Sequence, residues 1–123
     1  MPYSLPADVV LESGTTLDEG TLVSLIAKAD NRIDAVLRDS GLTGTTGDSD
    51  LEVASVHFTI AKIVDRSRLT NERTNSLNLG GDLTIGNNTQ NEIDYHEGLG
   101  REAVGRYIAR TRVRGSRIRR VNG

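Results

Sequence analysis

The sequence predicts a mainly α-helical protein: a small bundle of about three long helices, with a short β-hairpin between the second and third helices and extended N- and C-terminal arms. Two long segments carry apolar residues at three- and four-residue steps, the period of a helix with one buried face. Aromatic residues make up only 3% of the chain, so aliphatic side chains must fill the core, which suits packing between helices. With 123 residues we expect one domain, residues 16–109, between an arm (1–15) and a basic tail (110–123).

The sequence of the N-terminal part predicts an arm followed by a helix with a capping residue. Residues 3–14 hold two prolines before a short apolar pair, which favours an extended arm or a single helical turn. A helix is expected from Thr16 to about Ser40, because Thr16 and Glu19 have the spacing of a capping box. Gly41 is expected to end it. We interpret its apolar stripe as a core face, part of which could also meet a neighbouring subunit. The stripe comprises Leu22, Leu25, Ile26, Ala29, Ile33, Val36 and Leu37.

A second helix is expected to begin at Asp48 or Ser49, after a loop rich in glycine and threonine, and to run to about Arg73. Its apolar residues surround most of its circumference, which predicts a central position in the bundle. Those residues are Leu51, Val53, Ala54, Val56, Phe58, Ile60, Ala61, Ile63 and Val64.

Between the second and third helices the apolar residues alternate, which predicts a short hairpin at about residues 76–86 around the turn at residues 80–82. An isolated hairpin is marginal in water, so this one should pack on the helices or pair with a neighbouring chain. Possible contacts between subunits are Leu77, Leu79, Leu83 and Ile85.

The third helix is expected from about Thr89 to Arg112. Gly98, Gly100 and Gly105 each weaken it by about 1 kcal/mol relative to alanine. That cost indicates either close packing of the backbone against a neighbouring helix or a helix that forms fully only against partners.

The charge of the chain is divided between the body and the tail. Residues 1–109 hold 17 acidic and 9 basic residues, a formal charge of −8, whereas residues 110–123 hold six arginines and no acid. Such segregation is typical of an interaction tail. In an extended conformation its alternating arginines would project from one side and could add a strand to a partner's sheet. The predicted partner-binding residues are Arg110, Arg112, Val113, Arg114, Arg117, Ile118, Arg119, Arg120 and Val121.

Catalytic and metal chemistry find little support in the sequence. The absence of cysteine excludes disulfides, thiolate catalysis and metal sites held by cysteine. His57 falls within an apolar helix and is interpreted as a residue at the core edge. His96 could form a metal pair with Asp94 or Glu97, but two ligands do not make a site. We therefore expect no enzyme, no metal, no cofactor and no membrane contact, and a soluble, unprocessed product.

The order of elements resembles the head-tail connector, or adaptor, proteins of long-tailed viruses. The resemblance lies in the segment YSLPADVV, the helix core LVSLIAKADNRIDAVL, a second apolar helix, a short β segment and a third helix, over roughly residues 3–110. Its strongest positions are Tyr3, Pro6 and Val9, followed by Leu22, Ile26, Ala29, Ile33, Asp34 and Leu37.

The resemblance implies a ring of about twelve copies in the neck of the virion, assembled in the host cytoplasm. It implies a portal protein above the ring, a tail-side neck or tail-completion protein below it, and DNA passing through the lumen without sequence-specific binding. The C-terminal segment would extend from the bundle to the portal. The alternative is a small nucleic-acid-binding protein whose arginines contact phosphates, although the tail has no interleaved aromatic residue for base stacking.

Overall fold

The computed structural model describes the backbone of residues 2–75 and 82–122 and the side chains of residues 2–66 and 90–112. The mainly α-helical class is confirmed, whereas the predicted hairpin and the count of about three helices are wrong. Within the described backbone there is no strand, and there are four helices: α1 (Pro6–Ser13), α2 (Glu19–Asp39), α3 (Ser49–Asn75) and α4 (Asp82–Asn122).

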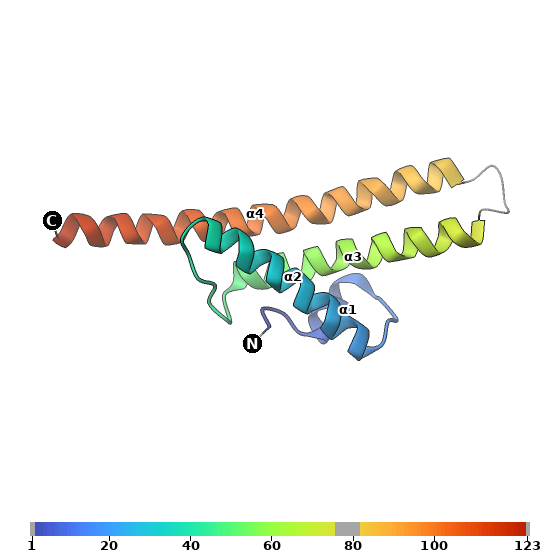
Figure 1. Ribbon diagram of the computed structural model, residues 1–123, viewed down its shortest axis with the longest axis horizontal. Coiled ribbons are helices and arrows are strands. Elements are labelled where there is room, and N and C mark those ends of the chain that lie inside the picture. Colours follow the sequence, from blue (N-terminus) through green and yellow to red (C-terminus); the bar gives the residue numbers. More distant parts are fainter. Residues whose placement is uncertain (1, 76–81, 123) are drawn as a thin grey trace.

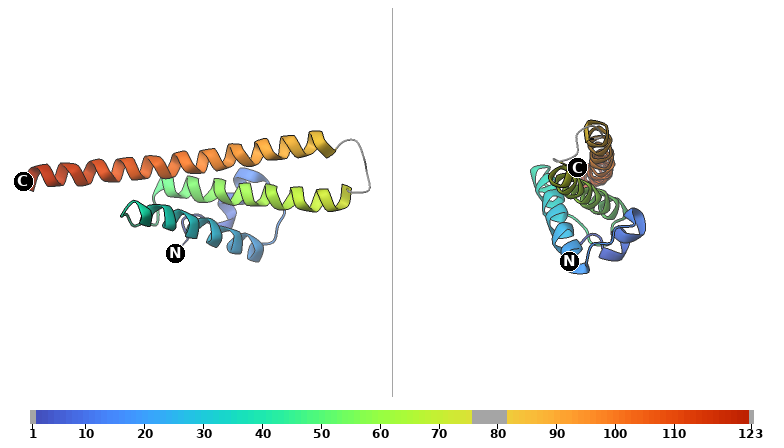
Figure 2. Two further views of the ribbon diagram at one scale, coloured as in Figure 1. Left: turned by 45° about the horizontal axis from the view of Figure 1, so that its top comes forward. Right: turned by 90° about the vertical axis from the view of Figure 1, so that its right-hand side faces the viewer.

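The two longest helices, α3 and α4, run antiparallel to one another, and α1 and α2 lie on one side of this pair (Figure 1). Figure 2 shows the same arrangement after rotation, with α1 and α2 beside only part of the length of the pair. Helix α3 contacts all three other helices, which confirms the central position predicted for it.

Helix α1 forms where the sequence was expected to give an arm or one turn. Pro6 occupies the first turn, where a missing N–H costs nothing, and Asp8 Oδ2 accepts a hydrogen bond of 2.9 Å from the backbone N–H of Leu5. Gly14, with φ of 67°, ends the helix in the left-handed conformation. Val9 is fully buried, and this burial stabilises the short helix against α2 and α3.

The N-cap of helix α2 is Asp18, two residues after the predicted cap at Thr16, and the helix begins at Glu19. The Asp18 carboxylate accepts hydrogen bonds from both the backbone N–H (3.2 Å) and the hydroxyl (2.6 Å) of Thr21. The predicted stop at Gly41 is confirmed, with φ of 74°. The N–H of Leu42 donates to the carbonyl of Leu37 at 2.8 Å, the bond of a Schellman motif.

The start of α3 agrees with its predicted position. Asp48 Oδ1 accepts hydrogen bonds from the backbone N–H groups of Asp50 (2.9 Å) and Leu51 (3.2 Å). These bonds satisfy donors that an uncapped helix would leave without partners.

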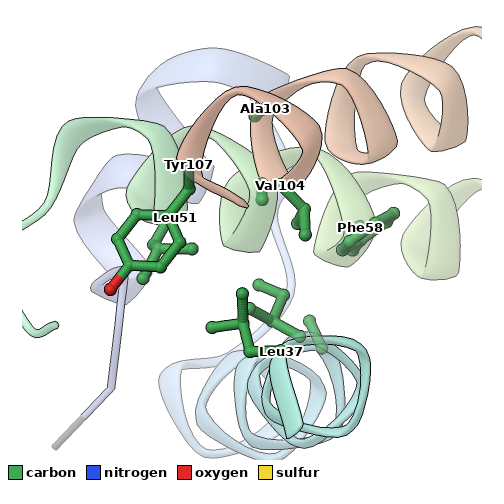
Figure 3. Close-up of a cluster of buried hydrophobic side chains, with 9 residues drawn as sticks. Leu37, Leu51, Phe58, Ala103, Val104 and Tyr107 are labelled. Atoms are coloured by element: carbon green, nitrogen blue, oxygen red, sulfur yellow. The ribbon is translucent and has the colours of Figure 1, made fainter. Parts of the chain in front are cut away.

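The core is mainly aliphatic, with Phe58 and Tyr107 as its two aromatic members, and it lies where α2, α3 and α4 meet (Figure 3). The predicted stripe of α2 is buried except for Val36, which is exposed. A second cluster joins α1 to α2 and α3 through Val9, Leu22, Ile26, Val56 and Ile60. The main cluster comprises Ala29, Ile33, Leu37, Leu51, Ala54, Phe58, Ala103, Val104 and Tyr107.

Of Gly98, Gly100 and Gly105, only Gly100 explains the close packing that the sequence indicated. A Cβ atom at Gly100 would lie 2.5 Å from Cε1 of Phe58, so only glycine lets the ring of Phe58 approach α4 at this level. A Cβ atom at Gly98 or Gly105 would meet nothing within 4 Å. Close packing is therefore specific to Gly100.

Helix α4 begins before and ends after the boundaries predicted for it. Leu83 and Ile85, assigned to the second strand of the hairpin, lie in its first turns, and Leu77 and Leu79 lie outside the described residues. Two apolar residues two positions apart are too short a pattern to distinguish a strand from a helix. Asp82 at the start of α4 favours the helix, because a carboxylate stabilises the positive end of the helix dipole.

The C-terminal arm is also helical, not extended, because α4 continues to Asn122. Arginine is a good helix former, and adding residues to an established helix costs far less than nucleating one. We call residues 113–122 the C-terminal extension. Figure 1 shows it running past the end of the four-helix body.

Candidate functional site

Arg110, the first arginine of the predicted tail, lies against the body. Its Nη2 atom lies 2.8 Å from Asp48 Oδ2 and 3.1 Å from Asp50 Oδ2. Its guanidinium carbon lies 5.5 Å from the ring centre of Tyr107, and Arg106 lies 3.3 Å from Asp50. Burial raises the pKa of Asp48, but hydrogen bonds from Arg110 and from backbone N–H groups outweigh it and hold that pKa below its usual range. Arg110 thus fastens α4 to the start of α3.

The remaining predicted partner-binding residues lie farther along α4. Arg112 is exposed, and the other seven belong to the C-terminal extension, whose side chains lie outside the described residues. Four arginines and no acidic residue occur in the extension. The residues are Val113, Arg114, Arg117, Ile118, Arg119, Arg120 and Val121.

The extension lies beyond the start of α3. Because Arg110 pairs with Asp48 at the first turn of α3, the residues that follow have no part of α3 beside them. At 1.5 Å per residue, the ten residues 113–122 span about 15 Å. A partner could therefore contact the extension without displacing the body.

A buried polar network holds the N-terminal segment on α2 and α3. Asp30 accepts hydrogen bonds from the hydroxyl of Ser55 (2.6 Å) and from the backbone N–H of Tyr3 (3.0 Å), and Ser4 Oγ lies 2.6 Å from Ser55 Oγ. The hydroxyl of Tyr3 donates to Asp34. Burial raises the pKa of Asp30, and the bonds from Ser55 and Tyr3 only partly oppose it. Asp30 is not one of the apolar residues of the predicted stripe, so the sequence pattern did not reveal this role.

A groove on the surface between α1 and α3 was also missed by the sequence reasoning. Leu11 is 88% exposed and Val53 is 37% exposed, and both line a hollow of about 340 Å³ that the buried Val56 also lines. We call this hollow the acidic groove. Its other lining residues are Asp8, Glu12, Glu52 and His57.

A signal for the groove was present in the sequence. Pro6 and Asp8 mark the start of a helix, and successive residues of a helix are rotated by about 100°. Leu11 therefore lies about 200° around α1 from the buried Val9, on the face turned away from the core.

His57 and His96, predicted to have unrelated roles, meet across α3 and α4. Their Nδ1 atoms lie 2.9 Å apart, and their rings stack with centres 5.1 Å apart and planes 19° apart. One nitrogen must donate and the other accept, so the two rings cannot both be protonated in this arrangement. Burial, followed by the charge of His96, lowers the pKa of His57, and Glu12 acts in the opposite direction.

The carboxylates near His96 have other partners. Glu97 Oε2 lies 2.6 Å from Arg32 Nη2, and Asp94 Oδ1 accepts a hydrogen bond of 2.9 Å from the side-chain amide of Gln90. The bond from Arg32 lowers the pKa of Glu97, and burial opposes it. Among the residues whose side chains are described, no group of three histidines or carboxylates could hold a metal ion.

No protein-family model, no curated protein and no solved structure matches the chain. None of the helices in the described part of the chain is long and apolar enough to cross a membrane.

Proposed function

We propose that the chain is a structural adaptor: one subunit of an oligomeric ring that joins the portal to the tail in the neck of a tailed virus. The observation that carries the proposal is the course of α4, which leaves the body as a helix and places the basic C-terminal extension clear of it. The portal is the proposed partner of this extension. A tail-side neck or completion protein would bind the opposite end of the ring.

Two further features support this role. The segment that resembles the connector family, Tyr3 to Val10, is anchored in the body through the Asp30 network and the burial of Val9. Packed apolar residues and ion pairs between helices, which are the means by which subunits fold and assemble, are also present in the described part of the chain.

The charge of the body suits a ring around DNA. Residues 1–112, which include Arg110, carry a formal charge of −6, and like charge repels phosphates, so DNA could slide through the lumen without being held. The contact of the extension with the portal would be weak in each copy, since an exposed ion pair contributes about 0–1 kcal/mol. In a ring, the binding of one extension holds the other extensions close to the portal, so many weak contacts together give strong binding.

Truncation after Arg112 tests the role of the extension. The truncated chain keeps Tyr107, Arg110 and their partners, so we expect unchanged helicity per residue and an unchanged melting temperature. We also expect it to lose binding to portal-bearing heads in a sedimentation assay. A matched variant with glutamine at the four arginines of the extension keeps the length of the helix and should lose binding as well.

Normal joining of heads and tails by the truncated chain would refute the assignment of the extension to the portal. If lysine at the same four positions restores binding fully, charge alone is sufficient. If it does not, the planar guanidinium groups make paired contacts that lysine cannot reproduce.

A nucleic-acid-binding role remains the second candidate, because the extension presents four arginines without a neighbouring acid in its sequence. Four contacts to phosphate predict that the logarithm of the affinity for duplex DNA falls with the logarithm of salt with a slope of about −3.6. A filter-binding titration with random duplex measures this slope. Weak binding with a shallow slope favours the adaptor.

A further inference from the structure

The acidic groove combines exposed apolar surface with negative charge. A single exposed leucine on a protein surface is ordinary, but Leu11 and Val53 together line one hollow, and three carboxylates line the same hollow. Its lining contains no lysine and no arginine. His57, the remaining polar residue of the lining, is mostly neutral at pH 7, since burial lowers its pKa.

These properties select an occupant that is basic and carries a few apolar side chains. The C-terminal extension has this composition: four arginines, no acid, and the apolar pair Ile118 and Val121 three positions apart. Residues three apart on a helix are neighbours on one face.

The extension cannot enter the groove of its own chain. It is the end of a continuous α4 that leads away from α1, as Figure 1 shows, and turning back would break the helix beyond the contact of Arg110 with Asp48. Only the groove of another molecule is within its reach.

We propose that the C-terminal extension of one copy docks in the acidic groove of a second copy, with its apolar residues on Leu11 and Val53 and its arginines on the surrounding carboxylates. The contact is head-to-tail: each copy gives an extension and receives one. Such an interface joins a third copy to the second and so builds a ring or an open chain.

This inference does not rest on the adaptor proposal, because it concerns the purified chain before it meets any portal. In a virion the portal would compete with the groove for the same extension. A stable interface usually takes 20 to 30 residues from each side, and the extension offers about a third to half of that number. We therefore expect micromolar or weaker affinity, reduced about tenfold between about 50 and 500 mM salt.

Two variants that damage opposite sides of the contact provide the test. Leu11→Asp places a charge in the groove at a side chain that is 88% exposed, so the fold should tolerate it. Truncation after Arg112 removes the extension. Each variant alone should sediment as a monomer at concentrations where the full chain associates. Mixed in equal amounts they should form a heterodimer and nothing larger, because one supplies the extension and the other the groove.

Glu12→Lys is a second groove variant that avoids any cost in folding, since a cation near the end of α1 suits the helix dipole. Val23→Asp, at a half-exposed valine of α2 outside the groove, is the matched control and should associate like the full chain. Sedimentation velocity from about 5 to 500 µM measures the mass of each sample.

The proposal is overturned if the full chain stays monomeric over this range at low salt. It is also overturned if the truncated chain or the Glu12→Lys variant associates as strongly as the full chain. A mixture of Leu11→Asp with the truncated chain that remains monomeric would equally exclude the contact. Binding to heads is a separate measurement, in which Leu11→Asp keeps the extension for the portal although it no longer docks in a groove.

Discussion

Replacing Gly100 by alanine tests how closely α3 and α4 approach one another. A Cβ atom at this position would lie 2.5, 2.7 and 2.9 Å from three atoms of the Phe58 ring. The ring is buried, and the guanidinium carbon of Arg32 lies 4.2 Å from its centre, so it cannot withdraw without disturbing other contacts. Overpacking costs about 1–3 kcal/mol, and the helix preference of alanine offsets about 1 kcal/mol of this. We expect the free energy of unfolding to fall by about 0–2 kcal/mol.

Gly105→Ala is the matched control on the same helix. A Cβ atom there meets nothing within 4 Å, so this variant should gain about 1 kcal/mol from helix preference alone. The difference between the two variants, about 1–3 kcal/mol, isolates the contact with Phe58 because the helix preference cancels. Urea unfolding followed by circular dichroism measures both. Equal midpoints for the two variants would refute the close approach, and Phe58→Leu should recover part of the loss in Gly100→Ala.

Three predictions concern pH and share one assay, the urea midpoint measured from about pH 3 to 8. Burial raises the pKa of Asp30, so ionisation of this carboxyl destabilises the folded wild type as pH rises. Asp30→Asn should therefore gain stability relative to wild type from about pH 4 to 7. A difference in stability that stays constant over this range would contradict the prediction. The hydrogen bond from Arg32 lowers the pKa of Glu97, so this ion pair stabilises the fold above the usual glutamate pKa and its contribution is lost as pH falls. Glu97→Gln should therefore lower the free energy of unfolding by up to about 1 kcal/mol at pH 7 and by little at pH 3. An equal loss at both pH values would exclude the ion pair as its cause. Burial and His96 lower the pKa of His57, so the folded wild type resists protonation of this ring and loses stability as pH falls from about 7 to 5. His57→Gln should lose less stability over the same range. An unchanged dependence of the urea midpoint on pH would count against the histidine pair.

The parts of the fold that could be predicted are those where several local signals agree. In α2 the apolar spacing and Gly41 locate the buried face and the end of the helix without knowledge of its neighbours. In α3 the cap at Asp48 and the broad apolar surface indicate both the start and the central position. Even the error of two residues at the start of α2 reflects competition between two good caps, Thr16 and Asp18.

The parts that could not be predicted depend on what each segment packs against. Residues 82–86 and 110–114 have alternating patterns that suit a strand, yet both belong to a helix that is packed on α3. Asp30 looks like a surface residue until the N-terminal segment places the N–H of Tyr3 beside it. The histidine pair likewise depends on the register between α3 and α4, which neither helix specifies alone.

The contacts of Arg110 also change where the body ends, and this decides how the chain should be cut. Truncation at residue 109 would remove the partner of Asp48 and Asp50 together with the extension, so a loss of assembly could reflect a damaged fold. Divided after Arg112, the body has 11 basic and 17 acidic residues, a charge of −6, and the remaining residues carry four arginines, a charge of +4. A cut at this point removes only residues beyond the described contacts with α3. A loss of binding is then caused by the absence of the extension itself, and an unchanged melting temperature shows that the fold of the body is intact.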